Sequence, residues 1–277
     1  MRRRFKTLRF LKNKVVLITG GSSGIGKAFA LEAARRGAIV VIAARNVEQL
    51  HQVEQQCLIL SGRPSFSYQL DVTDPDQIDE VLSKVNHEVG GVDVLVNSAG
   101  LGDFSEAVHE NWSTFEQMVR VNLLAAMYIS RCVAKQMMDQ GYGAIINLGS
   151  IAGKIPTPNS GAYSATKAGL IQFDDVLRME VADYGVQVLT VNPGPIDTPF
   201  WRHSGPNSRY RAHLPKWMFI SVDELAREVW NNVGYKTREI NVPTYVSYLS
   251  WIYRMIPGLG DWTIKKFFDF QQNRDEL

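Results

Sequence analysis

Short apolar or β-branched runs alternate with longer amphipathic stretches through most of this chain, and this alternation limits the possible folds more than any other feature. The order is typical of parallel strands joined by crossover helices, because strands buried on both faces are almost continuously apolar. It predicts an α/β fold with a doubly wound parallel sheet, whose ligands bind at the carboxyl ends of the strands. The predicted strands span 14–19, 39–43, 65–69, 92–96, 144–148, 186–191 and 239–242. The predicted helices begin near Ile25, Val47, Pro75, Trp112, Ala162 and Val222.

The composition argues against several other classes of protein. With 277 residues, of which 45% are hydrophobic and 21% charged, the chain suits a single globular domain with a sizeable core. A net charge of +2 gives no reason to expect a nucleic-acid partner, and the five histidines and two cysteines show no metal-ligand spacing. We expect no metal site, and we expect Cys57 and Cys132 to be reduced thiols in a cytoplasmic protein.

The first predicted strand leads directly into a glycine-rich turn over residues 19–26. Glycines there let the backbone turn sharply and approach a pyrophosphate, while the N-terminus of the following helix favours its negative charge. Such a turn alone also occurs for purely structural reasons, but its place on the first strand of an alternating pattern favours a Rossmann-type dinucleotide-binding domain. The residues of the turn expected to bind the cofactor are Thr19, Gly20, Ser22, Ser23, Gly24, Ile25 and Gly26.

The end of the second predicted strand indicates which nicotinamide cofactor is bound. An acidic residue there would accept a hydrogen bond from the ribose 2′-hydroxyl of NAD. This chain has Ala43, Ala44 and Arg45 instead. Arg45 could bind a 2′-phosphate, so we favour NADP(H) over NAD(H); the alternative is that Arg45 is a solvated charge at the strand end.

Tyr163 and Lys167 stand four residues apart at the start of a predicted helix, downstream of Ser150. This spacing places the phenol and the ammonium on one face of the helix, one turn apart. A lysine held there favours the phenolate and lowers the pKa of the phenol from its usual value of about 10. Tyr163 is therefore a candidate proton donor and acceptor, and beside a nicotinamide it would serve a carbonyl/alcohol oxidoreductase.

Two segments depart from the regular alternation. Residues 195–220 form a long connection that contains several aromatic side chains, among them Phe200 and Trp201, and a connection of that length is typically a lid or a binding loop. It also contains His203 and His213, which we consider as minor candidates for substrate contact. Because the lid is apolar, we expect an apolar carbonyl or alcohol substrate.

The chain ends in an aromatic-rich extension, 244–277, which glycines, a proline and Arg254 make unsuitable as a membrane span. One helical face is predicted to contain Tyr245, Leu249, Ile252, Tyr253 and Ile256. We interpret this face as packing on the domain or on another subunit; peripheral contact with a membrane is the alternative.

The chain begins with a basic segment, in which Lys12 and Lys14 interrupt any apolar run long enough for a signal peptide. We interpret residues 1–12 as a basic arm in solvent, with contact to anionic lipid as the alternative. The expected organisation is thus this arm, one catalytic domain over 13–243 that includes the lid 195–220, and the extension 244–277.

The motifs together resemble the short-chain dehydrogenase/reductase family over roughly residues 12–243. The resemblance rests on the turn at 19–26, Asp71 after the third strand, the segment 97–100 (Asn-Ser-Ala-Gly), the residues Asn122, Ser150, Tyr163 and Lys167, and the segment 193–198. It implies that Ser150 binds the carbonyl oxygen, that Tyr163 transfers the proton, that Lys167 lowers the pKa of the tyrosine and holds the ribose, and that Asn122 supports a water chain. Further cofactor contacts implied by the resemblance are Asp71, Val72, Asn97, Ala99, Gly100, Pro193, Gly194, Ile196 and Thr198, in addition to Tyr163 and Lys167.

The resemblance implies an NADP-dependent enzyme that interconverts a ketone and a secondary alcohol, with Tyr163 as acid and base. Two alternatives remain: a long-chain 3-keto lipid reductase at a membrane surface, and a catalytically silent NADP-binding regulator. A homo-oligomer, either a dimer or a tetramer, is also implied, with a dimer face on the helices that begin at Trp112 and Ala162. The long extension is a departure from the family, and it puts the tetramer in doubt because it could cover one interface.

Overall fold

The computed structural model describes residues 4–203, 214 and 216–274. Within them, seven strands form a single parallel sheet in the order β3-β2-β1-β4-β5-β6-β7. The strands are β1 Val15–Thr19, β2 Ile39–Ala44, β3 Ser65–Gln69, β4 Val94–Asn97, β5 Gly143–Leu148, β6 Val186–Pro193 and β7 Glu239–Val242. The α/β fold, the single domain and the doubly wound sheet are therefore confirmed, and every strand lies within two residues of its predicted bounds.

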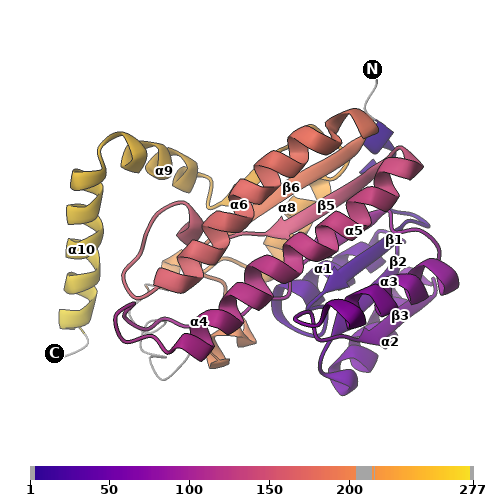
Figure 1. The fold of residues 1–277 in the computed structure, drawn as a ribbon, viewed down its shortest axis with the longest axis horizontal. Coiled ribbons are helices and arrows are strands. Elements are labelled where there is room, and N and C mark those ends of the chain that lie inside the picture. Colours follow the sequence, from indigo (N-terminus) through magenta and orange to yellow (C-terminus); the bar gives the residue numbers. More distant parts are fainter. Residues whose placement is uncertain (1–3, 204–213, 215, 275–277) are drawn as a thin grey trace.

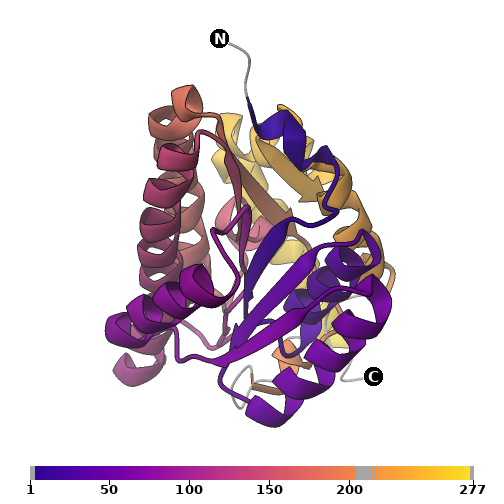
Figure 2. The same cartoon turned by 90° about the vertical axis from the view of Figure 1, so that its right-hand side faces the viewer.

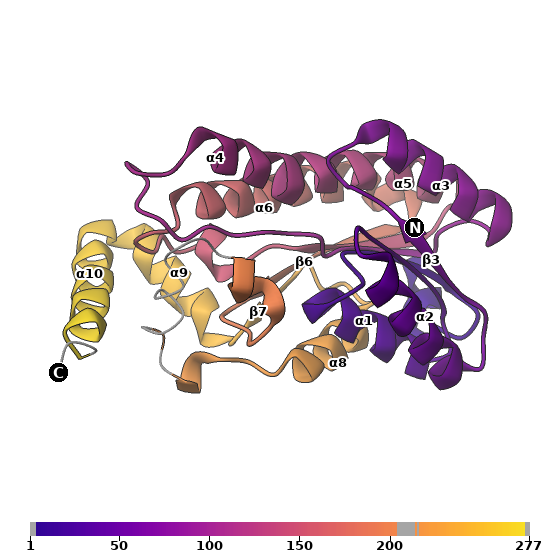
Figure 3. The ribbon, with the colours of Figure 1, turned by 90° about the horizontal axis from the view of Figure 1, so that it is seen from below.

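Helices cover both faces of the sheet, as Figures 2 and 3 show. One face carries α1 Gly24–Arg35, α2 Val47–Ser61 and α8 Val222–Asn232. The other carries α3 Pro75–Glu88, α5 Ala125–Gln140 and α6 Gly161–Val181. The helix α4 Trp112–Val119 continues into α5 through a π-helical turn, η2 Arg120–Leu124. The short 3₁₀ turns are η1 Arg4–Arg9, η3 Ile151–Gly153, η4 Ala182–Tyr184, η5 Pro199–His203 and η6 Lys216–Met218.

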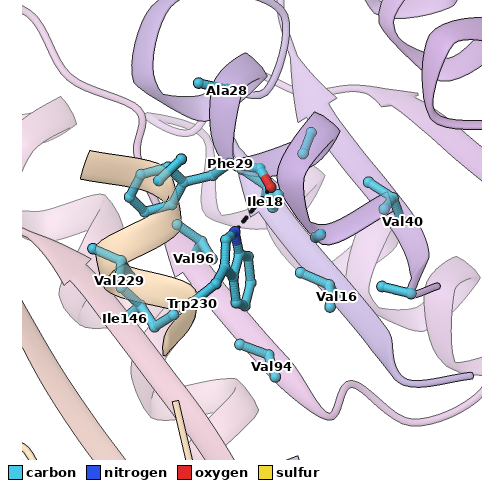
Figure 4. Close-up of a cluster of buried hydrophobic side chains, with 14 of the residues drawn as sticks. Val16, Ile18, Ala28, Phe29, Val40, Val94, Val96, Ile146, Val229 and Trp230 are labelled. Atoms are coloured by element: carbon cyan, nitrogen blue, oxygen red, sulfur yellow. Dashed lines mark hydrogen bonds between the residues drawn. The ribbon is translucent and has the colours of Figure 1, made fainter. Parts of the chain in front are cut away.

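The core on the α1 and α8 face forms around Trp230 and Phe29 (Figure 4). Their ring centroids are 6.2 Å apart, and Trp230 Nε1 donates to the carbonyl oxygen of Phe29 at 3.1 Å. The indole is buried with its polar atom paired, so its burial carries no cost from an unpaired donor. This contact fixes α8 against α1, whose N-terminus faces the functional site.

The N-terminal segment differs from an arm that is wholly in solvent. Leu8 and Leu11 are buried in the core. Arg9 lies 4.1 Å above the ring of Tyr235, and its Nε donates to the carbonyl oxygen of Gly234 at 3.3 Å. The arm predicted for residues 1–12 is thus docked on the domain at Leu8, Arg9 and Leu11, because the basic run is interrupted by leucines that fit the core.

The C-terminal extension forms two helices, α9 Tyr245–Met255 and α10 Pro257–Arg274. The α9 helix follows β7 and buries Val246 and Ser250, whereas α10 lies beside α9 at the end of the molecule opposite η1 (Figure 1). Among the described residues, the helices are all too short or too polar to cross a membrane.

Candidate functional site

A cavity of about 1180 Å³ lies at the carboxyl ends of the strands, between the turn after β1 and the C-terminal helices. The predicted site residues that line it are Gly20, Ser22, Ser23, Gly24, Ile25, Arg45, Asp71, Val72, Ala99, Gly100, Ser150, Tyr163, Lys167, Pro193, Gly194, Ile196 and Thr198. Four others, Thr19, Gly26, Asn97 and Asn122, are not part of the lining and support it from behind. The fold therefore assembles residues from six different strand ends around one space.

The glycine turn is held by very close backbone packing. Gly20 has φ +67°, and a Cβ atom on it would lie 2.8 Å from the backbone of Ala99. A Cβ on Gly26 would lie 2.3 Å from the carbonyl oxygen of Gly20, so neither position has room for a side chain. Thr19 Oγ1 accepts from the amides of Ser98 and Ala99, at 3.3 and 3.4 Å, and ties this turn to the end of β4.

The N-terminus of α1 is suited to an external anion. The helices α2 and α3 are capped by their own side chains, since Asn46 accepts from the amide of Gln49 and Asp74 from the amides that follow it. The Ser23 side chain at the start of α1 makes no such bond, and Ser23 and Gly24 line the cavity. Because an uncapped helix N-terminus favours negative charge, the residues present fit a cofactor pyrophosphate at this point.

Arg45 follows β2 and Asp71 follows β3, the two strands at one edge of the sheet. Both residues line the cavity, as does Tyr163, which comes after β5. Arg45 is exposed at the end of β2, with no acidic residue beside it in the sequence. Asp71 Oδ1 accepts from the backbone amide and the hydroxyl of Thr73, at 2.9 and 2.8 Å. Asp71 thus orders the turn before α3 and also lines the cavity.

Ser150, Tyr163 and Lys167 meet where η3 packs on α6. Ser150 is buried, and its hydroxyl accepts from the amide of Ala152 at 3.1 Å. A Cβ on Gly153 would lie 2.8 Å from the backbone of Ala168 and Lys167, so a glycine there lets η3 approach α6 this closely. Lys167 Nζ lies 5.8 Å from the centroid of the Tyr163 ring. Tyr163 and Lys167, predicted from their spacing, are therefore neighbours in the fold, and Ser150 lines the same cavity at the start of η3.

Lys167 is held by the end of β5. Its Nζ donates to the carbonyl oxygen of Leu148 at 2.7 Å. Burial lowers the pKa of Lys167 to about 8, and the negative charge of Asp174 partly opposes that shift. A lysine with such a pKa titrates close to working pH, which is typical of groups that take part in proton transfer.

Asp174 is a buried carboxyl two turns after Lys167 that sequence inspection did not single out. It accepts hydrogen bonds from Asn147 Nδ2 and from the hydroxyl of Thr190, the latter at 2.7 Å. Burial raises its pKa to about 7, while these bonds and the nearby Arg178 act in the opposite direction. Asn97 Nδ2 donates to Asn147 Oδ1 at 2.8 Å, so a buried polar chain runs from β4 across β5 to α6.

Asn122 lies on the π-helical turn η2 and is buried. Its Oδ1 accepts from the amide of Leu101 at 2.9 Å, while its Nδ2 donates to the carbonyl oxygen of Leu101 at 2.8 Å and to Thr166 Oγ1 at 3.2 Å. A Cβ on Gly100 would lie 3.4 Å from Asn122 Oδ1 and 3.8 Å from Lys167 Nζ, which shows that both side chains border this glycine. Such π-helical turns occur frequently at functional sites.

Aromatic side chains surround Tyr163. Phe104 lies 5.4 Å from it, between ring centroids, and Phe200 lies 5.9 Å from it. Trp201 stacks on Phe104 at 5.2 Å. The sequence drew attention to Phe200 and Trp201 in the lid but not to Phe104, which is buried after the segment 97–100; its position soon after that segment was the available signal.

The two ends of the lid are joined to each other by backbone contacts. Ile196 and Ile220 form a parallel bridge, and the amide of Ile220 donates to the carbonyl oxygen of Pro195 at 2.9 Å. Leu214 and Met218 line the cavity between these ends. His213 and the side chain of His203, which were considered for substrate contact, lie outside the described residues.

The predicted face of the extension also borders the cavity. Tyr245, Leu249, Ile252, Tyr253 and Ile256 all line it, and the lining continues on α10 through Leu259, Ile264 and Phe267. Four of these side chains, Tyr245, Leu249, Ile252 and Ile256, remain 45–54% exposed, so this face borders an open space, and the contact of α9 with the domain is made by Val246 and Ser250 instead. The apolar end of the cavity is formed largely by residues that follow β7.

The chain is similar to several known proteins. A model of the short chain dehydrogenase family matches residues 14–209. The chain is 35% identical to an oxidoreductase of Staphylococcus epidermidis over 68% of this chain and 80% of that protein. It is 34% identical to a 3-oxoacyl-[acyl-carrier-protein] reductase of Thermotoga maritima, over 79% of this chain and 89% of that protein. The structure of L-sorbose reductase from Gluconobacter frateurii, in complex with NADPH and L-sorbose, superposes with a TM-score of 0.75 and 30% identity, covering 83% of this chain and 95% of that one.

Proposed function

Because this chain belongs to the short-chain dehydrogenase/reductase family and is an oxidoreductase, we propose that it interconverts an apolar ketone and a secondary alcohol with NADP(H). The observation that carries the proposal is the meeting of Ser150, Tyr163 and Lys167 in one cavity with the uncapped N-terminus of α1. A catalytic group and a site for a cofactor phosphate thus border the same space.

The preference for NADP rests on the end of β2. Arg45 lines the cavity there, where an acidic residue would repel a 2′-phosphate. A guanidinium binds phosphate oxygens through charge-assisted hydrogen bonds. L-sorbose reductase, one of the similar proteins, was solved with NADPH.

In the mechanism that we propose, a bound nicotinamide would supply the hydride for reduction and accept it for oxidation. The Ser150 hydroxyl donates a hydrogen bond to the carbonyl oxygen of the substrate, where negative charge develops. Tyr163 gives its phenolic proton to the same oxygen, a contribution of about 10²–10⁴-fold for general acid catalysis. Lys167, held by the carbonyl of Leu148, favours the phenolate that remains, and Asn122 keeps the backbone of Leu101 in place behind it.

The apolar substrate is inferred from the walls of the cavity. Beside Tyr163 the walls are formed by Phe104, Phe200 and Trp201, and farther away by the apolar face of α9. Pockets of this kind bind apolar ligands and orient them through a few polar groups. Here those groups are Ser150 and Tyr163.

A reductase of long-chain 3-oxoacyl compounds is a second candidate. It is favoured by the 34% identity to the 3-oxoacyl-[acyl-carrier-protein] reductase of Thermotoga maritima together with the length of the apolar cavity wall. A ketone and a 3-oxoacyl thioester place the same carbonyl carbon beside Tyr163, so the two candidates differ in the group attached to it.

The test is the oxidation of NADPH by the purified protein with ketones and 3-oxoacyl thioesters of increasing chain length, beside Tyr163→Phe. We expect turnover that increases with apolar size and is lost in the variant, while NADPH binding is retained. Preference for the thioesters would select the second candidate. Tight NADPH binding without turnover of any substrate would instead favour a cofactor-binding regulator, and equal activity of Tyr163→Phe would exclude the mechanism.

A further inference from the structure

Most of the circumference of α9 is apolar, and its polar residues Ser247, Ser250 and Arg254 fall within one narrow sector. One side buries Val246 and Ser250 against the domain, and a second side lines the cavity. The third side presents Tyr248, Trp251 and Met255, which are 70%, 65% and 64% exposed. The single charged residue of α9 is Arg254, in its last turn. Because large apolar side chains that gather on one exposed surface mark an interaction site, the third side is expected to have an occupant.

The same surface continues on α10. Leu259 and Trp262 are exposed there, and Lys265 and Lys266 follow directly. Lys266 Nζ lies 4.9 Å from the centroid of the Trp262 ring. This combination of exposed indoles with neighbouring cations is typical of helices that lie in the interface of a membrane.

The charge of this surface favours one occupant. Over α9 and α10 the charged residues are Arg254, Lys265, Lys266 and Arg274 against Asp261 and Asp269, an excess of two cations. The carboxylate of Asp261 accepts from the hydroxyl of Tyr253 at 2.8 Å, so it joins the two helices. A second copy of the chain, packed by two-fold symmetry, would bring the same cationic patch to both sides of the contact. An anionic lipid surface is complementary to it.

We propose that α9 and α10 bind an anionic membrane surface, with Tyr248, Trp251, Met255, Leu259 and Trp262 among the lipid chains and Arg254, Lys265 and Lys266 at the head groups. The opposite side of α9 is the wall of the catalytic cavity. A lipid-soluble ketone therefore has a route from the bilayer along α9 to Tyr163. That second step rests on the proposed function, whereas the membrane contact does not.

The test is flotation of the full-length protein with vesicles of phosphatidylcholine mixed with phosphatidylglycerol, and with vesicles of phosphatidylcholine alone. We expect flotation with the anionic vesicles that decreases as salt is raised. Lys265→Glu/Lys266→Glu should weaken the partition at least tenfold, since each cation near an anionic surface contributes to binding. Trp251→Ser/Trp262→Ser should weaken it comparably through loss of apolar insertion.

Matched controls distinguish binding through α9 and α10 from non-specific binding of exposed side chains to the vesicles. Ile59→Ser removes an apolar side chain on α2 that is 80% exposed, more than either tryptophan, and Lys135→Glu reverses an exposed lysine on α5. Both should float like the unchanged protein, and circular dichroism should show that all variants are folded. Equal loss in controls and tail variants, or no flotation of the unchanged protein, would overturn the proposal.

Two further measurements distinguish membrane binding from dimerisation through the same surface and from the proposed catalytic function. If light scattering shows an oligomer that Trp251→Ser/Trp262→Ser dissociates, and flotation is absent, a second copy covers this surface and the lipid proposal is wrong. Tyr163→Phe should float normally while it is inactive. Its flotation therefore reports on the membrane surface alone, and its turnover reports on the proposed function alone.

Discussion

Gly153 controls the distance between Ser150 and the helix that carries Tyr163 and Lys167. A Cβ there would lie 2.8 Å from the backbone of Ala168 and Lys167, and backbone yields less readily than a side chain. Gly153→Ala should therefore destabilise the protein by about 1–3 kcal/mol and lower kcat, because η3 must move away from α6. Denaturant unfolding and steady-state kinetics measure the two effects.

The matched control is Gly258→Ala, since a Cβ on Gly258 meets no atom within 4 Å. It should leave both the free energy of unfolding and kcat essentially unchanged. If Gly153→Ala behaved in the same way, the close approach of η3 and α6 would not be required for the site.

Asp174 should make the stability of the protein depend on pH. Its pKa in the folded state is raised to about 7 from 3.8, so between these values the folded protein binds a proton that the unfolded chain has released. Stability from this group is therefore present at low pH and is lost as pH rises toward about 7. Asp174→Asn should remove that loss, on the order of 4 kcal/mol, since an amide can still pair with Asn147 and Thr190. The measurement is the free energy of unfolding of the two proteins as a function of pH. If the difference between them stayed constant over this pH window, Asp174 would not be the group that titrates.

Lys167 should determine the alkaline limit of turnover. Its pKa is lowered to about 8 by burial, and Asp174 acts to raise it. In the proposed mechanism kcat declines as Lys167 loses its proton above that pH. Asp174→Asn removes the opposing charge, so the alkaline limb of the pH profile of kcat should move to lower pH. A limb at the same pH in both proteins would show that Lys167 does not govern it.

These residues also show what a sequence can and cannot reveal about a site. Tyr163 and Lys167 were predicted because both stand on one helix, where spacing fixes their relative position. Asp174 and Phe104 were missed because their partners come from other elements: Asn147 and Thr190 in the one case, the lid aromatics in the other. Contacts of that kind depend on packing, which a linear pattern does not specify; for Phe104 the pattern gave only its position soon after the segment 97–100, and for Asp174 it gave no signal.

The end of β2 is the element that should set cofactor preference. Arg45→Ala should raise the KM for NADPH about tenfold or more, because a charge-assisted bond to a phosphate contributes roughly 1.5–3 kcal/mol. The KM for NADH, which has no 2′-phosphate, should remain the same and serves as the internal control. A parallel loss with both cofactors would indicate that Arg45 supports the fold of this loop and not the choice between them.

The predicted helix starts lie within one residue of the observed ones and the strands within two, but the irregular turn between α4 and α5 was not predicted. Apolar runs bounded by glycine, proline or polar residues define a buried strand on their own, as for β6 and β2. The π-helical turn η2 has no comparable signal: its sequence continues from α4 into α5 without a breaker. Its position is coupled to the pair of hydrogen bonds between Asn122 and Leu101, which join two elements far apart in the chain.

At the scale of the whole molecule, the N-terminal and C-terminal segments have different structural roles. The basic arm and the aromatic extension both suggested lipid contact, yet η1 and α10 lie at opposite ends (Figure 1). Leu8 and Leu11 anchor the first in the core, whereas the second lines the cavity. The sequence could not distinguish the N-terminal segment from the extension in this respect, because a segment that packs on the core can have the same composition as one that stays in solvent.

The layer formed by α4, α5 and α6 should be the surface through which two copies associate. It exposes Trp112, Leu124 and Met179, while Ala165 and Ala168 present small side chains that permit close helix packing. Ala125 and Ala126, at the start of α5, are buried inside the subunit and do not belong to this face. The helices α9 and α10 extend from β7 on another side of the molecule, so a dimer through α4–α6 leaves them free (Figure 3).

Leu124→Glu should convert this dimer to monomers, because it places two carboxylates in an apolar contact related by two-fold symmetry. Light scattering coupled to gel filtration measures the mass directly. Ile59→Glu introduces the same charge at an exposed position on α2, outside this layer, and should leave the dimer intact. A monomeric unchanged protein at micromolar concentration, or a dimer that survives Leu124→Glu, would place the association elsewhere. Since Tyr163 is reached from the cavity side, the monomeric variant should retain turnover, which would separate assembly from catalysis.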